Sequence, residues 1–159
     1  MFDTKSDAEL FAAYEQGIGQ IGRTVAGLSR EQLLAKPVEG KWSTQQVIIH
    51  LADAESAFTH RMKRIIAEDR PMFSAWDENR FTERLAYEHQ SAQDAATLVD
   101  LERRQMVRIL NATGLDVLTR TGVHTERGEQ TARVVMEYAV WHLSHHLKFV
   151  EEKKAKLGL

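Results

Sequence analysis

The stretch WHLSHHLKFVE, residues 141–151, holds three of the seven histidines of the chain within five residues. Apolar residues recur around it at helical spacing, which predicts that it lies in the middle of a long helix. A helix turns about 100° per residue, so His142 and His146 lie about 40° apart on one face, and His145 lies about 60° to the other side of His142. Two imidazoles at positions i and i+4 can bind one metal ion from the same side.

Length and composition indicate an ordinary globular protein. The 159 residues predict one domain, residues 1–159, and the fractions of hydrophobic (43%) and charged residues (28%) are those of soluble proteins. The net charge of −2 argues against nucleic-acid binding and against a polybasic membrane-binding surface. The chain has no long apolar run, and its start, MFDTKSDAEL, lacks the features of a signal peptide. We therefore expect a cytoplasmic protein.

The chain contains no cysteine. Disulfides, thiolate ligands and a cysteine nucleophile are therefore excluded within the chain. Any metal ion must be held by histidine nitrogen and by carboxylate or water oxygen. Any thiol that takes part in the chemistry must come from a small-molecule partner.

The apolar periodicity predicts four long amphipathic helices, which begin near Ser6, Ser43, Ser91 and Thr131. Each of these residues has a side chain that can cap a helix, and Ser6 and Ser43 are each followed three residues later by a residue that completes a capping box. The predicted fold is all-α: a four-helix bundle with short connecting helices and loops. Shorter helical segments are expected at residues 29–36 and 77–85, and turns with a short hairpin within residues 114–130.

The first predicted helix runs to about Leu28 and contains Gly17, Gly19 and Gly22. Each glycine lowers helix propensity by up to about 1 kcal/mol relative to alanine. We interpret these glycines as points of close packing against a neighbouring helix.

Three histidines are expected to point into the bundle. His142 lies at the centre of the apolar face of the fourth helix, His146 lies toward one side of it, and His50 lies at the edge of the apolar stripe of the second helix. A single core histidine is usually satisfied by a structural hydrogen bond. Three that converge are costly to bury without a ligand, and three nitrogens with one open position are typical of a catalytic metal site. We therefore expect His50, His142 and His146 to bind metal.

Two carboxylates follow His50 on the second helix and are the candidate catalytic residues. Asp53 could orient His50 through a hydrogen bond, or it could be an ordinary solvated residue. Glu55 lies on the apolar stripe and could be a buried hydrogen-bond partner, a metal ligand or a general base. Three other histidines lie in polar contexts and are expected to be exposed: His60, His89 and His124.

Two stretches together resemble the DinB/YfiT-like superfamily: KWSTQQVIIHLADAE at residues 41–55 and WHLSHHLKFVEE at residues 141–152. The connection PMFSAWDENRF, residues 71–81, is similar to the tryptophan- and acid-containing loop of YfiT-like members. The resemblance implies a four-helix bundle in which His50 is the first metal ligand and His142 and His146 form the second pair. His145 would then be a neighbour of the site, and the protein would be a homodimer.

The connecting loop and the residues after the histidine pair bear on substrate contacts. Trp76, Asp77 and Glu78 could line the mouth of the site or could simply pack as part of the loop. Many DinB-like members continue the histidine pair with Arg-Gly-Gln, whereas this chain has Leu147-Lys148-Phe149. The departure leaves the metal ligands unaffected, but it removes the basis for transferring substrate contacts from those members.

Three functions are compatible with these patterns. The first is a metal-dependent enzyme with a divalent ion, nickel or zinc ahead of iron or manganese, because nitrogen ligands alone do not select among them. It would act on a small-molecule substrate as a hydrolase of amides or esters, or as a transferase using a low-molecular-weight thiol, as the resemblance to the S-transferase branch implies. The second is a stress-associated protein that binds a metal or small ligand without turnover. The third is a structural bundle with a polar core and no metal.

Overall fold

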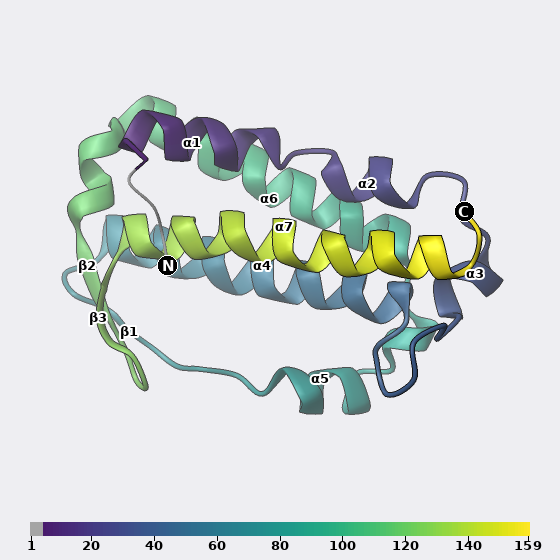
Figure 1. The fold of residues 1–159 in the computed structure, drawn as a ribbon. Helices are drawn as coiled ribbons and strands as arrows, with labels where there is room; N and C mark the ends of the chain where they lie inside the picture. The colour runs from purple at the N-terminus through teal and green to yellow at the C-terminus, as the bar shows by residue number, and fades with distance from the viewer. Residues whose placement is uncertain (1–4) are drawn as a thin grey trace.

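Three long helices run side by side through the computed structural model, which describes residues 5–159 (Figure 1). They are α4 (Thr44–Ala67), α6 (Ala92–Thr113) and α7 (Ala132–Lys156), and α4 packs against both of the others. The first four residues of MFDTKSDAEL, the stretch analysed for a signal peptide, lie outside the described range. Within residues 5–159, no helix combines the length and apolar content that a membrane span needs.

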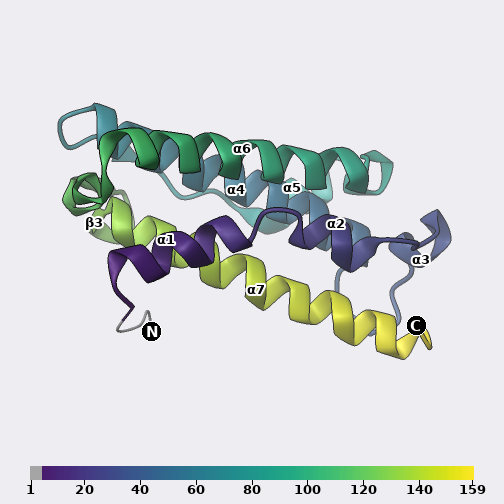
Figure 2. The same cartoon turned by 90° about the horizontal axis from the view of Figure 1, so that it is seen from above.

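Two helices in line, α1 (Asp7–Gln16) and α2 (Gln20–Val25), complete the four-helix bundle (Figure 2). Both contact α6 and α7. The single helix predicted here is therefore wrong, and the break has a local cause. Gly19 adopts φ 77°, a conformation that favours glycine, and its amide donates to Oδ1 of Asp100 at 2.7 Å.

The packing interpretation of the glycines is correct for Gly17 only. A side chain at Gly17 would overlap the guanidinium of Arg103 and approach Leu143. A Cβ at Gly22 would meet no described atom within 4 Å. Close packing therefore accounts for one of these glycines, whereas the turn at Gly19 accounts for the end of α1.

The helix starts are confirmed by their caps. Ser6 and Ser43 form the capping boxes expected with Glu9 and Gln46, and Thr131 accepts a hydrogen bond from the amide of Val134. Each such cap contributes about 1 kcal/mol to helix stability. Ser91 caps α6 as expected, and Ser29, which was not predicted as a cap, forms a capping box at the start of α3 (Arg30–Leu34).

Short elements fill the two long connections. The connection from α4 to α6 lies along one side of α4 (Figure 1). It contains β1 (Met72–Phe73), the predicted helix α5 (Glu78–Arg84) and the 3-10 turn η1 (Tyr87–His89). The connection from α6 to α7 contains η2 (Leu115–Thr119) and the predicted hairpin, β2 (Thr121–His124) and β3 (Gly128–Thr131).

The hairpin is extended to three strands by β1, which pairs parallel to β2 with Met72 opposite Val123. This strand was not predicted, because two residues are too few to show the alternation of a strand. Its pairing ties the start of the first connection to the second one. The residues that follow β1 are thereby held close to α4, next to His50.

The apolar core consists of two clusters that follow each other along the bundle. On α7, buried residues up to Ala139 belong to one cluster and those from Leu143 belong to the other. On α6, the change occurs between Val99 and Met106. Buried polar side chains, among them His142 and Arg103, lie at this junction.

Candidate metal centre

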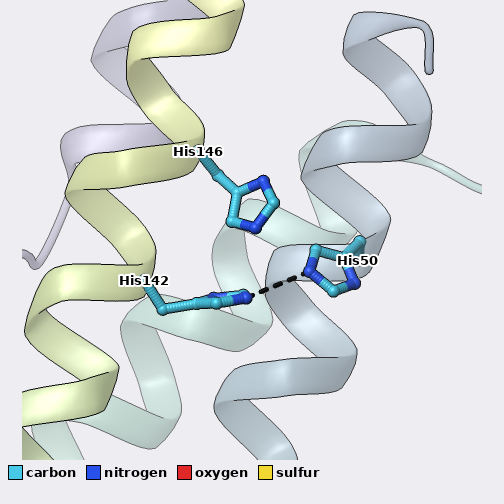
Figure 3. Close-up of side chains that lie close together, drawn as sticks. All are labelled: His50, His142 and His146. Carbon is cyan, nitrogen blue, oxygen red and sulfur yellow. Dashed lines mark hydrogen bonds between the residues drawn. The ribbon is translucent and has the colours of Figure 1, made fainter. Parts of the chain in front are cut away.

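Three histidines converge at the junction of the two clusters (Figure 3). His50 comes from α4, and His142 and His146 come from successive turns of α7. Each residue offers one ring nitrogen, and these nitrogens all lie within 4.8 Å of one another. Nε2 of His50 and Nε2 of His142 are 3.1 Å apart. The structure therefore brings together the three histidines that the sequence singled out, and it does so from two helices.

His50 was expected only at the edge of an apolar stripe, but it is buried because connecting segments pack on α4. Its exposed fraction is 0%, and every residue from 44 to 52 of α4 is buried. The rings of Trp42 and Trp76 lie 5.0 Å and 5.7 Å from the His50 ring. Both tryptophans belong to connecting segments, so these segments help to enclose the His50 imidazole.

All three imidazoles are neutral near pH 7. Burial lowers the pKa of His50 to about 3, that of His142 to about 2 and that of His146 to about 4. Repulsion from neighbouring imidazoles, chiefly His146 acting on the other two, lowers the pKa values of His50 and His142 further. Neutral imidazole is the form that binds a metal ion, because its unprotonated nitrogen carries the lone pair.

The donor set fits a divalent first-row metal ion. Two nitrogens that are each about 2.0–2.1 Å from a tetrahedral ion lie about 3.3 Å apart, close to the separation of the His50 and His142 nitrogens. Nδ1 of His50 and Nδ1 of His146 are buried and have no hydrogen-bond partner within the described part of the chain. Among the described residues, the only hydrogen bond within the cluster joins Nε2 of His50 and Nε2 of His142, and these two buried Nδ1 atoms stay unpaired, whereas the buried nitrogens of a purely structural group of histidines are expected to be paired.

A cavity of about 140 Å³ opens beside His50 and His142. A second cavity of about 330 Å³ includes His146 in its wall, together with Trp42 and Phe149. The histidines therefore separate two spaces, each large enough for part of a small molecule, since a cavity of about 150 Å³ can hold benzene. A ligand could reach the ring nitrogens from either side.

The two predicted candidate carboxylates lie elsewhere. Asp53 accepts a hydrogen bond from the Tyr87 hydroxyl. Glu55 accepts a 2.6 Å hydrogen bond from the Tyr14 hydroxyl and forms a 2.8 Å ion pair with Arg103. Among residues 5–159, neither carboxylate is hydrogen-bonded or ion-paired with a histidine. Of the roles left open for Glu55, the structure shows that of a buried hydrogen-bond partner.

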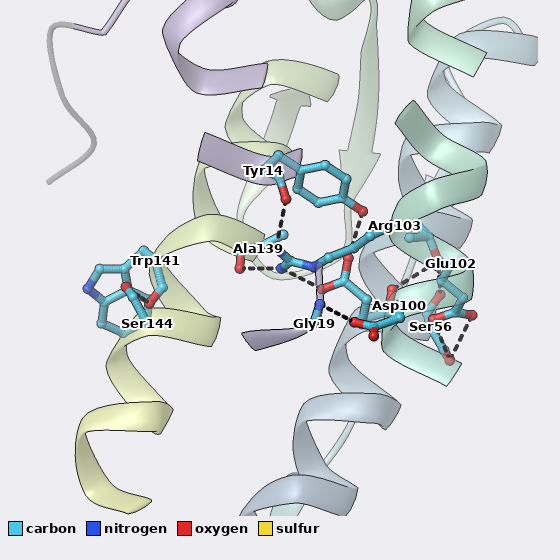
Figure 4. Close-up of polar contacts among 11 residues, drawn as sticks. Tyr14, Gly19, Ser56, Asp100, Glu102, Arg103, Ala139, Trp141 and Ser144 are labelled. Carbon is cyan, nitrogen blue, oxygen red and sulfur yellow. Dashed lines mark hydrogen bonds and ion pairs between the residues drawn. The ribbon is translucent and has the colours of Figure 1, made fainter. Parts of the chain in front are cut away.

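The Glu55 network is itself extensive (Figure 4). Arg103 has an exposed fraction of 0% and donates to the carbonyl oxygens of Tyr14 and Ala139, both at 3.1 Å. Its guanidinium also lies 4.5 Å from the centre of the Tyr14 ring. Burial and the Glu55 carboxylate raise the pKa of Tyr14 well above its ordinary value. The group joins α1, α4, α6 and α7.

The carboxylate that does lie beside the histidines is Glu78. Its Oε2 is 4.0 Å from Nε2 of His50, and its side chain is 56% exposed. Glu78 and Trp76 both line the smaller cavity, which supports the expectation that this loop borders the site. The signal in the sequence was only the acidic character of the loop. The distance to His50 depends on how the connection packs on α4.

The other four histidines lie outside the cluster, and one of them, His124, is not exposed as predicted. His145 stacks on Trp141, with ring centres 4.5 Å apart, and takes no part in the cluster. His60 and His89 are exposed as expected. His124 was expected to be exposed but is only 4% exposed, because its ring packs against Phe73 of β1, with ring centres 5.7 Å apart. Its Nδ1 accepts the amides of Glu126 and Arg127 in the hairpin turn.

Comparisons with known proteins identify the family. The sequence model of the DinB superfamily matches residues 13–150. The chain belongs to the DinB superfamily. A protein of Oceanobacillus iheyensis named "Putative metal-dependent hydrolase" is 30% identical over 129 residues, which are 80% of this chain and 73% of that protein. A Bacillus cereus protein of the same name is 22% identical over 139 residues, 87% of this chain and 80% of that protein.

Two solved structures of four-helix bundle proteins share the fold. YfiT from Bacillus subtilis, described as a probable metal-dependent hydrolase with an unusual four-helix bundle topology, superimposes with a TM-score of 0.87 at 19% identity. The superposition covers 99% of this chain and 91% of YfiT. The four-helix bundle protein TT2238 gives a TM-score of 0.64 at 20% identity, over 92% of this chain and 99% of that one. The predicted four-helix bundle of the YfiT type is confirmed.

Proposed function

We propose that this DinB superfamily protein is a metal-dependent hydrolase whose divalent ion is held by His50, His142 and His146. The observation that carries the proposal is the convergence of three neutral imidazoles, two buried and one partly buried, beside a cavity. The names of the relatives support the same class of function. Zinc and nickel are the proposed ions, since both suit a site made of imidazole nitrogens.

When bound, such an ion supplies a Lewis acid that polarises a carbonyl group and lowers the pKa of water. The residues of this chain contribute position and proton transfer. Glu78 lies 4.0 Å from His50 and lines the cavity, so its carboxylate is placed to accept a proton from an attacking water molecule. Trp42 and Trp76 pack against the His50 ring and fix its orientation while they exclude bulk water.

A thiol-dependent transferase is the second candidate, and the larger cavity favours it. This cavity of about 330 Å³ includes His146, Trp42 and Lys153 in its walls and can accommodate a small thiol beside the histidines. The chain has no cysteine, so the sulfur nucleophile would come from that co-substrate. Its sulfur would form a bond to an electrophilic carbon, and the leaving group would depart with the bonding electron pair. The proton released by the thiol would pass to a carboxylate or to water.

Metal content after purification tests the proposed site directly. The variants His50→Ala, His142→Ala and His146→Ala are each expected to lose the bound ion, whereas His145→Ala, one residue away from the cluster, is expected to retain it. Elemental analysis of the four variants and the parent protein gives the ion and its stoichiometry. Metal content that stays unchanged in all three cluster variants would refute the site.

Turnover is tested with the metal-loaded protein and three substrate groups: amides, esters, and a small thiol with an electrophile. Hydrolysis of an amide or ester that disappears in His142→Ala is the expected result. Glu78→Gln is expected to lower kcat while metal content is retained. Metal binding without turnover of any substrate would instead favour a protein that holds a metal or small ligand without catalysis.

A further inference from the structure

The smaller cavity has a cationic end that the proposed hydrolysis does not use. Besides His50, His142 and Glu78, its walls include Arg61 from α4 and Arg127 from the turn of the β2–β3 hairpin. Arg61 lies about three helical turns after His50 on α4, and long side chains on a helix lean toward the N-terminus of that helix, here toward His50. Both arginines therefore border the same space as the histidines.

Each guanidinium is held in place without a carboxylate partner. Arg61 donates to the carbonyl oxygen of Ser74 at 2.7 Å and lies 5.5 Å from the centre of the Phe73 ring. Arg127 lies 5.0 Å from the centre of the Tyr138 ring. In the described part of the chain, no carboxylate forms an ion pair with either arginine.

The two cations are close enough to affect each other. Burial, followed by repulsion from Arg127, lowers the pKa of Arg61. Burial and both arginines also lower the pKa of His124, and the nearby Glu126 offsets this only in part. Glu126 borders the same cavity, but it forms no ion pair with the arginines within residues 5–159. An added anion would relieve the repulsion between the two guanidinium groups.

His124 contributes a third donor. Its Nδ1 accepts two backbone amides, so the single proton of the neutral ring lies on Nε2. The residue is buried and lines the cavity with the arginines. Two guanidinium groups and an imidazole N–H form a set of donors that matches the oxygens of a carboxylate or a phosphate.

We propose that Arg61, Arg127 and His124 bind an anionic oxygen group of the substrate, a carboxylate or a phosphate, while the bond to be cleaved lies at the three histidines. The position of the cleaved bond at the histidines rests on the proposed function, whereas the anion site does not depend on it. The substrate class is accordingly a small anionic amide or ester. Arg127 and Arg61 would determine the affinity for this substrate, and Glu78, at the histidine end of the cavity, would not contact its anionic group.

The test is a titration of chelator-treated, dialysed protein with inorganic phosphate, acetate and neutral propionamide, followed by NMR of the arginine Nε–H groups and the hairpin amides. Phosphate or acetate is expected to shift the signals of Arg61, Arg127 and the hairpin, and propionamide is not. Arg127→Gln, at an exposed turn residue, and Arg61→Gln are each expected to weaken anion binding about 10- to 100-fold, as for the loss of a charged hydrogen bond. Added salt should weaken binding to the parent protein more than to these variants.

Two controls separate the anion site from the metal centre. Arg108→Gln removes an exposed arginine of α6 and is expected to leave anion affinity within about twofold. His142→Ala should retain anion binding while it loses metal. Tighter binding of phosphate than of acetate would assign the group to a phosphate, and the reverse order would assign it to a carboxylate.

Anion affinity that is unchanged in Arg61→Gln and Arg127→Gln would overturn the anion site and leave the metal proposal intact. Failure of both anions to shift the arginine signals of the parent protein would overturn it equally. If anion binding follows the arginines but the histidine variants keep their metal, the metal centre fails and the anion site stands.

Discussion

Two polar groups are buried near the middle of the bundle, and they differ in how they are satisfied. Arg103 makes hydrogen bonds to Glu55 and to two carbonyl oxygens, and Glu55 also accepts the Tyr14 hydroxyl, so only Nε of Arg103 lacks a partner there. The three histidines leave two buried nitrogens without a partner within residues 5–159 and border two cavities. Burial of polar side chains alone therefore does not indicate a functional site. Buried ring nitrogens that lack a hydrogen-bond partner and lie beside a cavity do indicate such a site.

The largest expected effect comes from removing a member of the hydrogen-bonded group of Tyr14, Glu55 and Arg103. Arg103→Met leaves the Glu55 carboxylate buried without its cation and is expected to lower the free energy of unfolding by about 3–5 kcal/mol. Urea denaturation measures this loss. Replacing both partners, Arg103→Met with Glu55→Gln, should recover part of it, because no charge is then left unpaired. A loss below about 1 kcal/mol for Arg103→Met would show that the network is not what holds these helices together.

Removing one of the three clustered histidines should affect metal binding. His142→Ala is expected to lower affinity for zinc or nickel at least about 100-fold, or about 2.8 kcal/mol, because it removes one of three ligands. In the parent protein, added metal should raise Tm by mass action, and in His142→Ala it should not. Isothermal titration and thermal unfolding measure the two effects. The matched control is His145→Ala, whose parent side chain stacks on Trp141 outside the cluster. An equal Tm increase in His142→Ala and His145→Ala would show that metal binding does not depend on the three clustered histidines.

The features that the sequence predicted well are those determined by neighbouring residues. Helix starts depend on a cap residue and the three residues after it, and the boxes at Ser6 and Ser43 form as predicted. The pairing of His142 with His146 follows from the helical repeat alone. His50 was assigned from its place at the edge of the apolar stripe of α4, and the resemblance to a family motif supported it, because no local pattern relates α4 to α7.

The features that the sequence did not predict depend on packing between distant segments. Glu55 pairs with Arg103 because of the register between α4 and α6, and 48 residues separate the two in the chain. The break at Gly19 is held by a hydrogen bond to Asp100 on α6. His124 lies opposite Phe73 in the pairing of β1 with β2, and the centres of the two rings are 5.7 Å apart. Local propensity does not specify such contacts.

Low pH should lower the stability of the fold through protonation of the three histidines. In the unfolded chain each imidazole has an ordinary pKa near 6.5, whereas burial lowers the folded values to between about 2 and about 4. Below pH 6.5 the unfolded state therefore binds protons that the folded state does not. The stability of the metal-free protein is complete above pH 6.5 and falls as the pH decreases toward the folded values, by about 1.4 kcal/mol per pH unit for each histidine.

From pH 7 to pH 5 this loss amounts to about 2 kcal/mol per histidine. Urea denaturation across this range measures it, and His142→Gln should show a shallower dependence than the parent protein because one such group has been removed. Carboxylates common to both proteins cancel in this difference. Identical pH dependence of the two proteins would show that the His142 ring can be protonated in the fold at little cost.

The smallest effect concerns Asp53, which lies on α4 between His50 and Glu55 and which the sequence left open as a partner of His50. Tyr87 is fully buried, and its hydroxyl donates to Asp53. Burial and the Asp53 hydrogen bond raise the pKa of Tyr87, which keeps the hydroxyl protonated as the donor. Tyr87→Phe is expected to lower the free energy of unfolding by about 1–2 kcal/mol, the cost of one lost hydrogen bond to a partly buried charge, with metal content unchanged. Asp53→Asn should behave in the same way, because the bond ties η1 to α4 and does not reach the histidines. If Asp53→Asn instead releases the metal ion, Asp53 acts on His50 after all and belongs with the histidines.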